Sequence, residues 1–579
     1  MSIARGKRRG AARLAALGWL VLAGCDRGPE RVSAVLVTVD SLRPEALGCY
    51  GSPVAVTPNI DRIAAEGVLY TNARTAAPLT LPAHASILTG LYPLRHGVRD
   101  DTSTPLPEAA VTIAERASQA GYQTAAFVGA AILDRGWGLA QGFDHYGQLP
   151  LPSETSVTAR SPERAAREVV AEARAWLAAR DRRRPFLVWI HLFDPQPPFA
   201  PSPEAVERAG GNTYLAEVAA VDDAIGELAR ALEAEPRPQP TLFVLTSPHG
   251  EALGAHDETS HGLYGYDSTL RVPLVIRYPD RRRAGERPSD IVSVVDVAPT
   301  LLGALDLGAA PDADGIDLRG AVPVERGVYF ESYQSHVRYG FSPIAGWVDA
   351  GGKYLHQTTP QFFDPIRDPA EAEDRIADGA PLDRYRRALA DVAARPRLSG
   401  DVRTDAELQA ALASLGYAPS ATPLPEPLAD TGLPDTRTRT DELQRLYTAL
   451  GEGERGNLDQ AIRGLERVLA DNPRNRVARM WLATYLVHAE RCAEAIPQLR
   501  ELVRSGTAGS SSSNSLGHCL LEQGDAEKAL VHFRRASQLD PTNPIPAGNV
   551  ALALERLGRD DEAQLYWRRY GELGSGAGR

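Results

Sequence analysis

Thr80 stands where a hydroxyl could act as a nucleophile. It lies in the stretch 78–99, which reads P-L-T-L-P-A-H-A-S-I-L-T-G-L-Y-P-L-R-H-G-V-R, and Pro82 with the apolar-periodic run after it predicts the beginning of a helix. Unpaired backbone N–H groups favour an anion at such a position, which suits attack on an anionic group. The alternative for Thr80 is an ordinary N-capping threonine.

Three polar residues, Asp40, Asp194 and His249, follow segments that are typical of buried strands. The segments are 34–39, 185–191 and 242–246. Ligands of parallel sheets bind outside the carboxyl ends of the strands, so residues far apart in the sequence would converge on one site. One Asp after a strand is usually a turn former or a helix cap, but three such strand ends indicate a shared site.

Histidines gather in a Gly-rich loop after the third of these strands. His249, His256 and His261 are three of the chain's twelve histidines and lie within thirteen positions. Such a cluster is typical of a site that binds a metal or an anion. The alternative is a loop of solvated histidines without a ligand.

The elements that must position these residues alternate between strands and helices. Further strands are expected at 122–128 and 272–277, and helical patterns lie at 58–66, 82–91, 107–120, 162–180, 215–232 and 296–305. This alternation predicts an α/β fold, in which helices cover both faces of a mainly parallel sheet. Short apolar segments at 328–330 and 353–355 predict a smaller sheet that closes the domain.

The C-terminal part of the chain predicts a second, all-α domain. Residues 366–440 read as an irregular linker, with five prolines between 418 and 440. Beyond it the sequence repeats with a period of 34, seen in the alanines Ala461, Ala495, Ala529 and Ala563. This period predicts about four tetratricopeptide repeats at 441–575, stacked so that a concave face binds a protein or a peptide.

The N-terminus predicts export and anchoring. Basic residues precede an apolar run at 14–23, which ends in Leu22-Ala23-Gly24-Cys25. We interpret residues 1–25 as a lipoprotein signal peptide with a lipobox, in which Cys25 is lipidated. The alternative is a chance run of small residues before a cysteine. The prediction is a membrane-anchored lipoprotein on the periplasmic side of a bacterial envelope.

Composition excludes one class of partner. The 579 residues carry a net charge of −11, and no basic patch compensates for it, so we expect no nucleic-acid binding. Cys49, Cys492 and Cys519 have no metal-type spacing, and the sequence does not reveal whether any of them forms a disulfide.

Several motifs in a fixed order resemble the sulfatase branch of the alkaline phosphatase superfamily. They read V-T-V-D-S-L-R-P, L-G-C-Y-G, T-P-N-I-D-R-I-A-A-E-G, T-L-P-A-H-A-S-I-L-T-G-L-Y-P-L-R-H-G-V-R, H-G-E-A-L-G-A-H and L-R-V-P-L-V-I. The match spans about 33–365, so we expect a sulfatase-like catalytic domain at 26–365. Bacterial sulfatase-like proteins with tetratricopeptide tails share this layout.

The resemblance implies a metal-assisted displacement at a sulfate or phosphate ester. It places the nucleophile at Thr80, which also touches a divalent metal ion such as Ca, Mn or Zn. The other metal ligands that it implies are Asp40 and His249, with Asp194 and His261 at positions that bind a second metal or the ester oxygens in different branches. His84 stands where sulfatases have a catalytic arginine, and His256 is the expected substrate-binding residue.

The chain departs from the family pattern at four positions. Thr80 replaces the Cys or Ser that is converted to formylglycine, so we expect no formylglycine. Pro248 replaces a metal carboxylate, Gln196 replaces a histidine, and Ser41 replaces a second Asp. Losing a direct metal ligand should cost more than the 10-fold to 100-fold that is typical for an outer partner.

Two hypotheses of different classes follow from this pattern. The first is a lipid-anchored, metal-dependent ester hydrolase whose repeats hold a partner. The second is a catalytically impaired pseudo-sulfatase that acts as a membrane-anchored binding scaffold, a reading motivated by Pro248 and Gln196.

Overall fold

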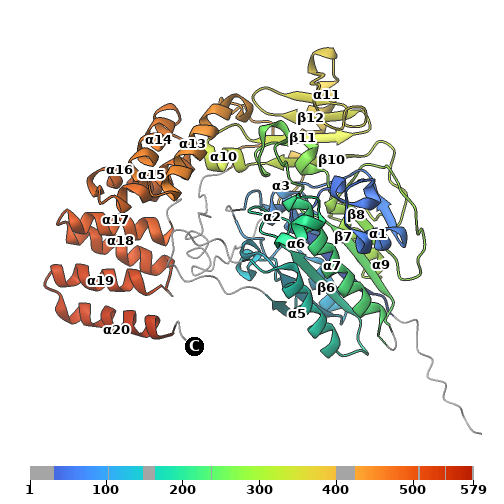
Figure 1. Ribbon diagram of the computed structural model, residues 1–579, viewed down its shortest axis with the longest axis horizontal. Coiled ribbons are helices and arrows are strands. Elements are labelled where there is room, and N and C mark those ends of the chain that lie inside the picture. Colours follow the sequence, from blue (N-terminus) through green and yellow to red (C-terminus); the bar gives the residue numbers. More distant parts are fainter. Residues whose placement is uncertain are drawn as a thin grey trace, which may run out of the picture.

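The computed structural model describes two regions, an α/β domain and an arc of helices (Figure 1). The residues it describes are 31–101, 104–147, 163–235, 238–398, 424–505, 509–541 and 543–576. The predicted signal peptide and Cys25 lie outside these residues. Within them, every helix is too short or too polar to cross a membrane.

A seven-stranded sheet forms the centre of the α/β domain. Its strands, in spatial order, are β2 (Val68–Tyr70), β8 (Leu274–Arg277), β7 (Thr241–Thr246), β1 (Ser33–Val39), β6 (Phe186–Leu192), β4 (Gln123–Val128) and β5 (His145–Gly147). Strands β7, β1, β6, β4 and β5 run parallel, and β8 is antiparallel to both of its neighbours. The mainly parallel sheet is confirmed, with an antiparallel strand near one edge.

Register decides where the strands end. Thr38 of β1 pairs with His191 of β6 on one side and with Thr246 of β7 on the other. The three strands therefore end at the same level, and the residues that follow them meet at one edge of the sheet.

Helices cover both faces of this sheet, because the side chains of buried strands alternate between the faces. Val35 and Val37 of β1 pack toward one face, and Leu36 packs toward the other. One face is covered by α1 (Pro58–Ala65), α5 (Ala166–Ala179) and α7 (Thr213–Glu233). The other face is covered by α2 (Thr80–Thr89), α4 (Ile113–Gln119) and α9 (Val297–Ala304).

A smaller antiparallel sheet extends the domain. It consists of β10 (Gly327–Ser332), β11 (Ile344–Asp349), β12 (Gly352–His356) and β13 (Gln361–Phe363), in that order. The two predicted segments lie in β10 and β12, and β11 separates them. The short helix α10 (Gln334–Tyr339) connects β10 to β11.

Shorter elements complete the α/β domain. They are β3 (Ala73–Arg74), which pairs with β9 (Val292–Ser293), and the helices α3 (Pro93–His96), α6 (Pro203–Arg208) and α8 (Asp267–Leu270). A buried ion pair joins α8 to the smaller sheet, since Lys353 of β12 contacts Asp267 of α8 at 2.8 Å. Lys353 also contacts Glu371 at 2.7 Å.

The described residues 366–398 and 424–440 are more ordered than the predicted irregular linker. Helix α11 (Leu382–Ala393) buries Tyr385, Leu389 and Val392 against the domain, a spacing of four and three residues that forms one helical face. Residues 424–435, here called the strap, also attach to the domain. The backbone N–H of Ser342 donates to the carbonyl of Pro434 at 2.8 Å.

The arc consists of eight helices that form four consecutive hairpins, as expected for tetratricopeptide repeats. They are α13 (Thr440–Glu454), α14 (Leu458–Asp471), α15 (Arg476–His488), α16 (Cys492–Arg504), α17 (Ser510–Glu522), α18 (Ala526–Leu539), α19 (Pro544–Arg556) and α20 (Asp560–Gly576). The four alanines that mark the 34-residue period are all buried. A disulfide between Cys492 and Cys519 joins α16 to α17.

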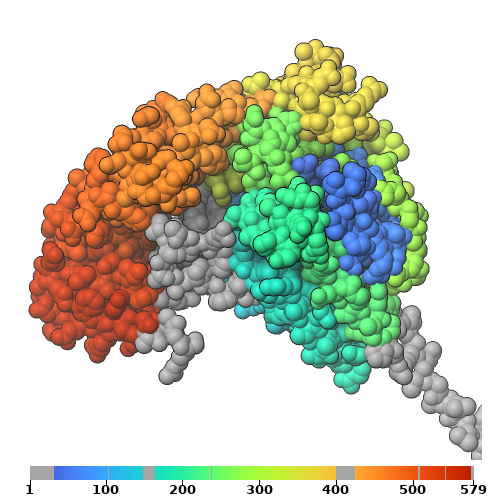
Figure 2. Space-filling model, viewed as in Figure 1, coloured from blue at the N-terminus to red at the C-terminus, as the bar shows by residue number. Residues whose placement is uncertain are grey.

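The two regions are in contact at the beginning of the arc. Figure 2 shows the first repeat, in orange, against the part of the α/β domain that holds the smaller sheet. The last repeats, in red, lie at the far end of the molecule (Figure 2).

Candidate active site

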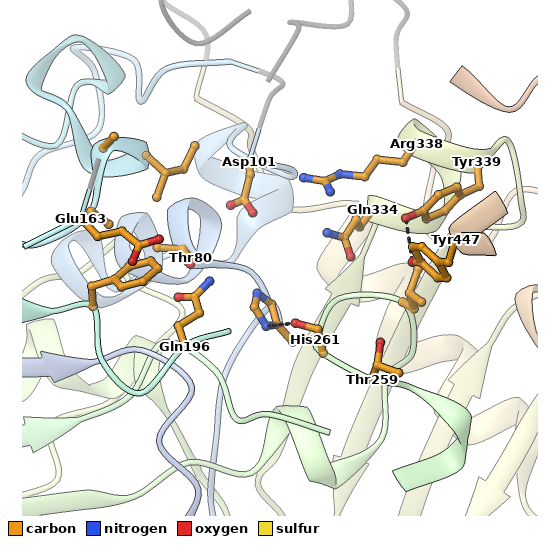
Figure 3. Close-up of a pocket in the computed structure, with 16 residues that line it drawn as sticks. Thr80, Asp101, Glu163, Gln196, Thr259, His261, Gln334, Arg338, Tyr339 and Tyr447 are labelled. Carbon is orange, nitrogen blue, oxygen red and sulfur yellow. Dashed lines mark hydrogen bonds between the residues drawn. The ribbon is translucent and has the colours of Figure 1, made fainter. Parts of the chain in front are cut away.

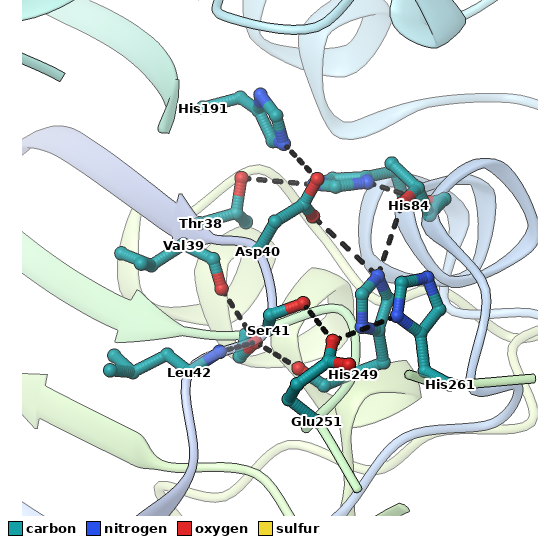
Figure 4. A network of polar contacts seen from close by, with 12 residues as sticks. Thr38, Val39, Asp40, Ser41, Leu42, His84, His191, His249, Glu251 and His261 are labelled. Carbon is teal, nitrogen blue, oxygen red and sulfur yellow. Dashed lines mark hydrogen bonds and ion pairs between the residues drawn. The ribbon is translucent and has the colours of Figure 1, made fainter. Parts of the chain in front are cut away.

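Asp40 lies at the sheet edge, immediately after β1, and is fully buried. Its Oδ2 lies 3.2 Å from Nε2 of His191, and its Oδ1 lies 3.8 Å from Nε2 of His249 (Figure 4). Burial opposes ionisation of this carboxyl, but His191, His249 and His84 surround it and lower its pKa to about 2. Asp40 is therefore an anion at neutral pH.

Thr80 is the first residue of α2, and its hydroxyl faces His249. The distance from Thr80 Oγ1 to His249 Nε2 is 3.1 Å, and the hydroxyl does not cap the helix. The other ring nitrogen of His249, Nδ1, lies 2.9 Å from the carbonyl oxygen of Gly250. A carbonyl can only accept, so Nδ1 carries the hydrogen and Nε2 accepts the hydrogen bond from Thr80.

Burial keeps His249 neutral in this arrangement. Desolvation, together with the neighbouring His261, lowers the pKa of His249 to about 4. A neutral imidazole that accepts a hydroxyl hydrogen can take up the proton when that hydroxyl attacks. The pair of Thr80 and His249 thus has the form of a nucleophile and its base.

Asp101 supports the helix that carries Thr80. Its Oδ1 accepts a hydrogen bond of 2.9 Å from the backbone N–H of Leu81, at the N-terminus of α2. The chain therefore caps this helix from a distant segment, which leaves the Thr80 side chain available for the site.

His84 is held by two internal hydrogen bonds. Its Nδ1 donates to the carbonyl oxygen of Thr80 at 2.7 Å, and its Nε2 lies 3.0 Å from Oγ1 of Thr38. The Thr38 oxygen also accepts from the indole N–H of Trp189 at 3.0 Å, so its own hydrogen is directed to His84. This geometry does not support the expected catalytic role of His84 and makes it a residue that positions the first turn of α2.

His261 forms a buried ion pair beside His249. Its Nδ1 lies 2.9 Å from Oε2 of Glu251, which also accepts from the Ser41 hydroxyl at 2.7 Å. Burial disfavours the charged imidazole, but Glu251 outweighs this and raises the pKa of His261. The ring of His261 stacks on that of His249 with centroids 4.0 Å apart. Glu251 favours the charged form of His261, which suits contact with an anion, and the expected metal-ligand role of His261 stays a prediction.

Asp194 lies in a different environment from Asp40. Its Oδ2 accepts a hydrogen bond of 2.8 Å from the backbone N–H of Ala166, the first residue of α5. The carboxylate therefore caps the N-terminus of α5. This geometry does not support the metal-ligand role expected for Asp194.

His256 also lies apart from the imidazole cluster. Its ring stacks on Tyr266 with centroids 3.7 Å apart, and its Nε2 lies 2.9 Å from the carbonyl oxygen of Ala370. Both interactions fix a surface loop, so they do not support the substrate-binding role expected for His256.

His191 and Glu251 are site residues that the sequence reasoning did not select. His191 is the only polar residue of the β6 segment F-L-V-W-I-H-L, and it points to the same face of the sheet as Trp189. A histidine inside a wholly apolar strand is the signal that could have identified it. Glu251 follows His249 by two residues in the H-G-E motif, which is the corresponding signal.

The residues at the sheet edge fit a cation. Apart from the 3.2 Å contact between Asp40 Oδ2 and His191 Nε2, these two atoms and Asp40 Oδ1 are buried without a hydrogen-bond partner among the residues that the structure describes. Ligand atoms of Asp40, His84 and His191 all lie within 4.8 Å of one another. Buried polar atoms without partners are costly, and a bound cation would satisfy them.

A cavity of about 230 Å³ opens beside this cluster (Figure 3). Thr80 lies at one end of it, near Gln196, and His261 contributes to its wall (Figure 3). Most of its other polar walls come from Asp101, Glu163, Thr259, Ser260, Gln334 and Arg338. The cavity thus brings the hydroxyl of Thr80 and the imidazole of His261, which bonds to Glu251, to one polar space.

Comparison with solved structures places the fold in a known class. A phosphonate monoester hydrolase of Agrobacterium radiobacter superposes with a TM-score of 0.53 at 23% identity, covering 63% of this chain and 96% of that one. The arrangement of sheet and helices is therefore the fold of this hydrolase.

Sequence comparison then defines the domains. Residues 33–307 match the sulfatase family, and residues 448–512 and 483–544 match a tetratricopeptide repeat. An uncharacterized sulfatase of Escherichia coli K12, YidJ, is 26% identical over 423 residues, covering 60% of this chain and 84% of the relative. An N-acetylglucosamine-6-O-sulfatase of Bacteroides thetaiotaomicron is 25% identical over 466 residues, covering 60% and 81%. The chain contains a sulfatase domain followed by tetratricopeptide repeats.

Proposed function

We propose that this protein is a metal-dependent hydrolase of sulfate or phosphate esters with Thr80 as its nucleophile. The observation that carries the proposal is the 3.1 Å contact between Thr80 Oγ1 and a neutral His249 beside the buried Asp40. A hydroxyl at the beginning of a helix, with a base in reach and an anionic carboxylate near the same ring nitrogen of that base, fits covalent catalysis.

Asp40 and His191 would hold a divalent metal ion through the buried atoms that lack hydrogen-bond donors among the described residues. Thr80 and His249, the other predicted ligands, border the same place. When bound, the metal would offset the charge of the ester and favour ionisation of the attacking hydroxyl. Imidazole and carboxylate together suit Zn²⁺ or Mn²⁺ better than Ca²⁺, which prefers oxygen ligands alone.

The residues of the chain would share the chemical steps. The Thr80 oxygen attacks the sulfur or phosphorus atom while its proton passes to Nε2 of His249, and the ester bond breaks to release the alcohol, which takes up that proton. His261, whose charged form Glu251 favours, lines the same cavity and would offset the charge on the ester oxygens. Water then releases the group from Thr80, which restores the hydroxyl.

The ester class stays open between sulfate and phosphate. Thr80 does not form formylglycine, which separates this site from sulfatases that depend on that group. Among the similar proteins, one is named for N-acetylglucosamine 6-O-sulfate and another for phosphonate monoesters. Both chemistries therefore belong in the assay.

The remaining predictions concern the location and the partner of the protein. We propose that Cys25 anchors it to a membrane on the periplasmic side, and that the repeats bind a protein or a peptide. The disulfide between Cys492 and Cys519 supports export, because disulfides persist in oxidising compartments. Cys25→Ser should release the protein from membranes, and continued attachment would contradict the anchor.

A non-catalytic scaffold is the second candidate function. The observation that favours it is Pro248, which follows Ser247 at the end of β7 and offers no carboxylate to a metal. On this hypothesis the domain binds an anion without turning it over. Pro248→Asp should then create activity that the natural chain lacks.

The decisive experiment uses residues 29–579. Bound metal is measured by elemental analysis, and hydrolysis is measured with 4-nitrophenyl sulfate, 4-nitrophenyl phosphate and bis(4-nitrophenyl) phosphate. Thr80→Ala should abolish turnover and leave the fold intact. Thr89→Ala is the matched control and should keep the activity. Thr89 lies at the other end of α2, where its hydroxyl donates to the Ala85 carbonyl and accepts from the Leu91 N–H. A metal-free protein with equal rates in all three forms would refute the hydrolase.

A further inference from the structure

Helix α10 belongs to two cores at once. Gln334 and Arg338 line the cavity that also holds Thr80. Tyr339, the last residue of the helix, and the nearby Phe341 are buried among the apolar residues of the first repeats. The wall of the cavity and the base of the repeat domain are therefore built from one short segment.

Polar contacts fix the repeat domain to this segment. The side-chain amide of Asn472 donates to the carbonyl oxygen of Tyr339 at 2.8 Å and to Oε1 of Glu442 at 2.7 Å. Asn475 donates to the same Glu442 oxygen at 3.1 Å. Glu442 lies in the first turn of α13, so these bonds hold that helix against α10.

This attachment places Tyr447 of α13 in the wall of the cavity. Its hydroxyl lies 3.3 Å from the hydroxyl of Tyr339. Figure 3 shows the two phenol groups together at one end of the cavity, with Thr80 at the other. Tyr447 is 43% exposed, so part of its ring is available for contact with a bound molecule.

The position of the two tyrosines relates to the two parts of an ester. The charged sulfate or phosphate group must sit at Thr80, because the nucleophile lies there, and His261 lines the same cavity. The organic part then extends along the cavity toward the tyrosines. An aromatic ring with a hydroxyl offers both a flat apolar face and a hydrogen bond, which suits a ring that carries hydroxyl groups.

We propose that Tyr447, a residue of the repeat domain, is a specificity-determining residue of the hydrolase pocket and contacts a hydroxyl-bearing leaving group. The inference rests on the proposed function, since it takes the ester to be bound at Thr80. The sulfatase domain alone lacks this wall, so the repeat domain completes the substrate pocket in addition to any partner that it binds.

Binding to the full chain without turnover tests this proposal. In a Thr80→Ala background, affinities are measured by calorimetry for inorganic sulfate, inorganic phosphate, glucose 6-sulfate and glucose 6-phosphate. Tyr447→Ala should weaken binding of the favoured sugar ester about tenfold and leave the inorganic anions unchanged. Tyr447→Phe keeps the aromatic ring, so it should weaken binding of this sugar ester less than Tyr447→Ala does.

Tyr570→Ala is the matched control, because Tyr570 lies in the last repeat helix and is 42% exposed. It should change none of the four affinities. Thermal unfolding of each variant shows whether the repeats remain folded.

The outcomes separate this inference from the function on which it rests. If neither the anions nor the sugar esters bind the Thr80→Ala protein, the proposed function fails and the inference falls with it. If the anions bind but the sugar esters bind no better, the leaving-group assignment is wrong. If Tyr447→Ala weakens anions and esters equally, or changes neither, Tyr447 has no part in recognising the leaving group.

Discussion

Asp40 and Asp194 follow neighbouring parallel strands, but their carboxylates have different hydrogen-bond partners. The Asp40 carboxylate lies among imidazoles and, apart from its contact with His191, has no hydrogen-bond partner among the described residues, whereas the Asp194 carboxylate accepts the first N–H of α5. The difference shows that a position after a strand does not by itself make a ligand. What matters is whether a backbone N–H already occupies the carboxylate.

Glu258 is a third buried carboxyl group, and one of its oxygens, Oε2, has no hydrogen-bond partner among the described residues. Burial raises the pKa of Glu258 to about 8, whereas the imidazoles around Asp40 lower its pKa to about 2. Glu258 is therefore protonated at neutral pH, and Asp40 is charged. Only a charged, unoccupied carboxylate attracts a cation.

The largest effect is expected at Asp40. Asp40→Asn removes the charge and keeps the shape, so bound metal should disappear and ester hydrolysis should fall by at least about 100-fold. Elemental analysis and the rate of ester hydrolysis measure the two losses. The matched change Asp194→Asn should retain both metal and rate. An Asp40→Asn protein with normal metal content would invalidate the contrast between the two positions.

The second-largest effect is expected at His191. Its Nε2 faces Asp40, and the Gly129 N–H, which lies 3.1 Å from the His191 carbonyl and 3.3 Å from Nδ1, steadies the ring. His191→Ala should weaken metal affinity by about 10-fold to 100-fold, measured by titration of the metal-free protein. His256→Ala should leave that affinity unchanged, and equal losses in the two variants would count against the assignment.

Glu258 predicts a dependence of stability on pH. Its pKa rises on folding from the usual 4.5 to about 8, so the folded state keeps a proton that the unfolded state releases. Stability from this group is complete below pH 4.5 and is lost as the pH rises toward 8, by at most about 1.4 kcal/mol per pH unit. Urea unfolding of Glu258→Gln should show a flatter profile over this range, and an unchanged slope would refute the effect.

The smallest effect is expected at Asp194. Asp194→Ala removes an acceptor from the end of α5 and should lower the free energy of unfolding by about 0.5–2 kcal/mol. Activity should stay within a few-fold of that of the natural chain. Thermal unfolding measures the change in stability, and the ester assay measures the change in activity. Loss of bound metal in this variant would show that Asp194 is a metal ligand.

The fold could be predicted because its signals are local. Apolar runs at β1, β6 and β7 and the 34-residue period of the repeats are properties of neighbouring residues. The sequence pattern does not predict helix α11, since the apolar face of this helix consists of only three residues in a polar segment. Nor does it predict the strap, because the attachment of the strap depends on backbone hydrogen bonds that Pro-rich sequences do not reveal.

The site could be predicted only in part. Asp40, Thr80, His249 and His261 do lie together, as the strand ends and the histidine cluster indicated. The role of Asp194 depends on the position of α5, and the role of His191 depends on the register between β1 and β6, neither of which the sequence contains. Tyr447 enters the pocket only because two domains dock, so no local pattern could have identified it.

The sharing of α10 between two cores limits how this protein can be cut or recombined. Its residues Gln334 and Arg338 border the cavity, whereas Tyr339 packs into the repeats. A truncation placed in the Pro-rich segment would expose the apolar side chains of Tyr339 and Phe341 on the remaining hydrolase domain. It would also remove the wall of the cavity that Tyr447 forms. A chimera that exchanges the helical arm for another one must therefore carry matching residues at 339 and 341, even though these precede the arm by about a hundred positions.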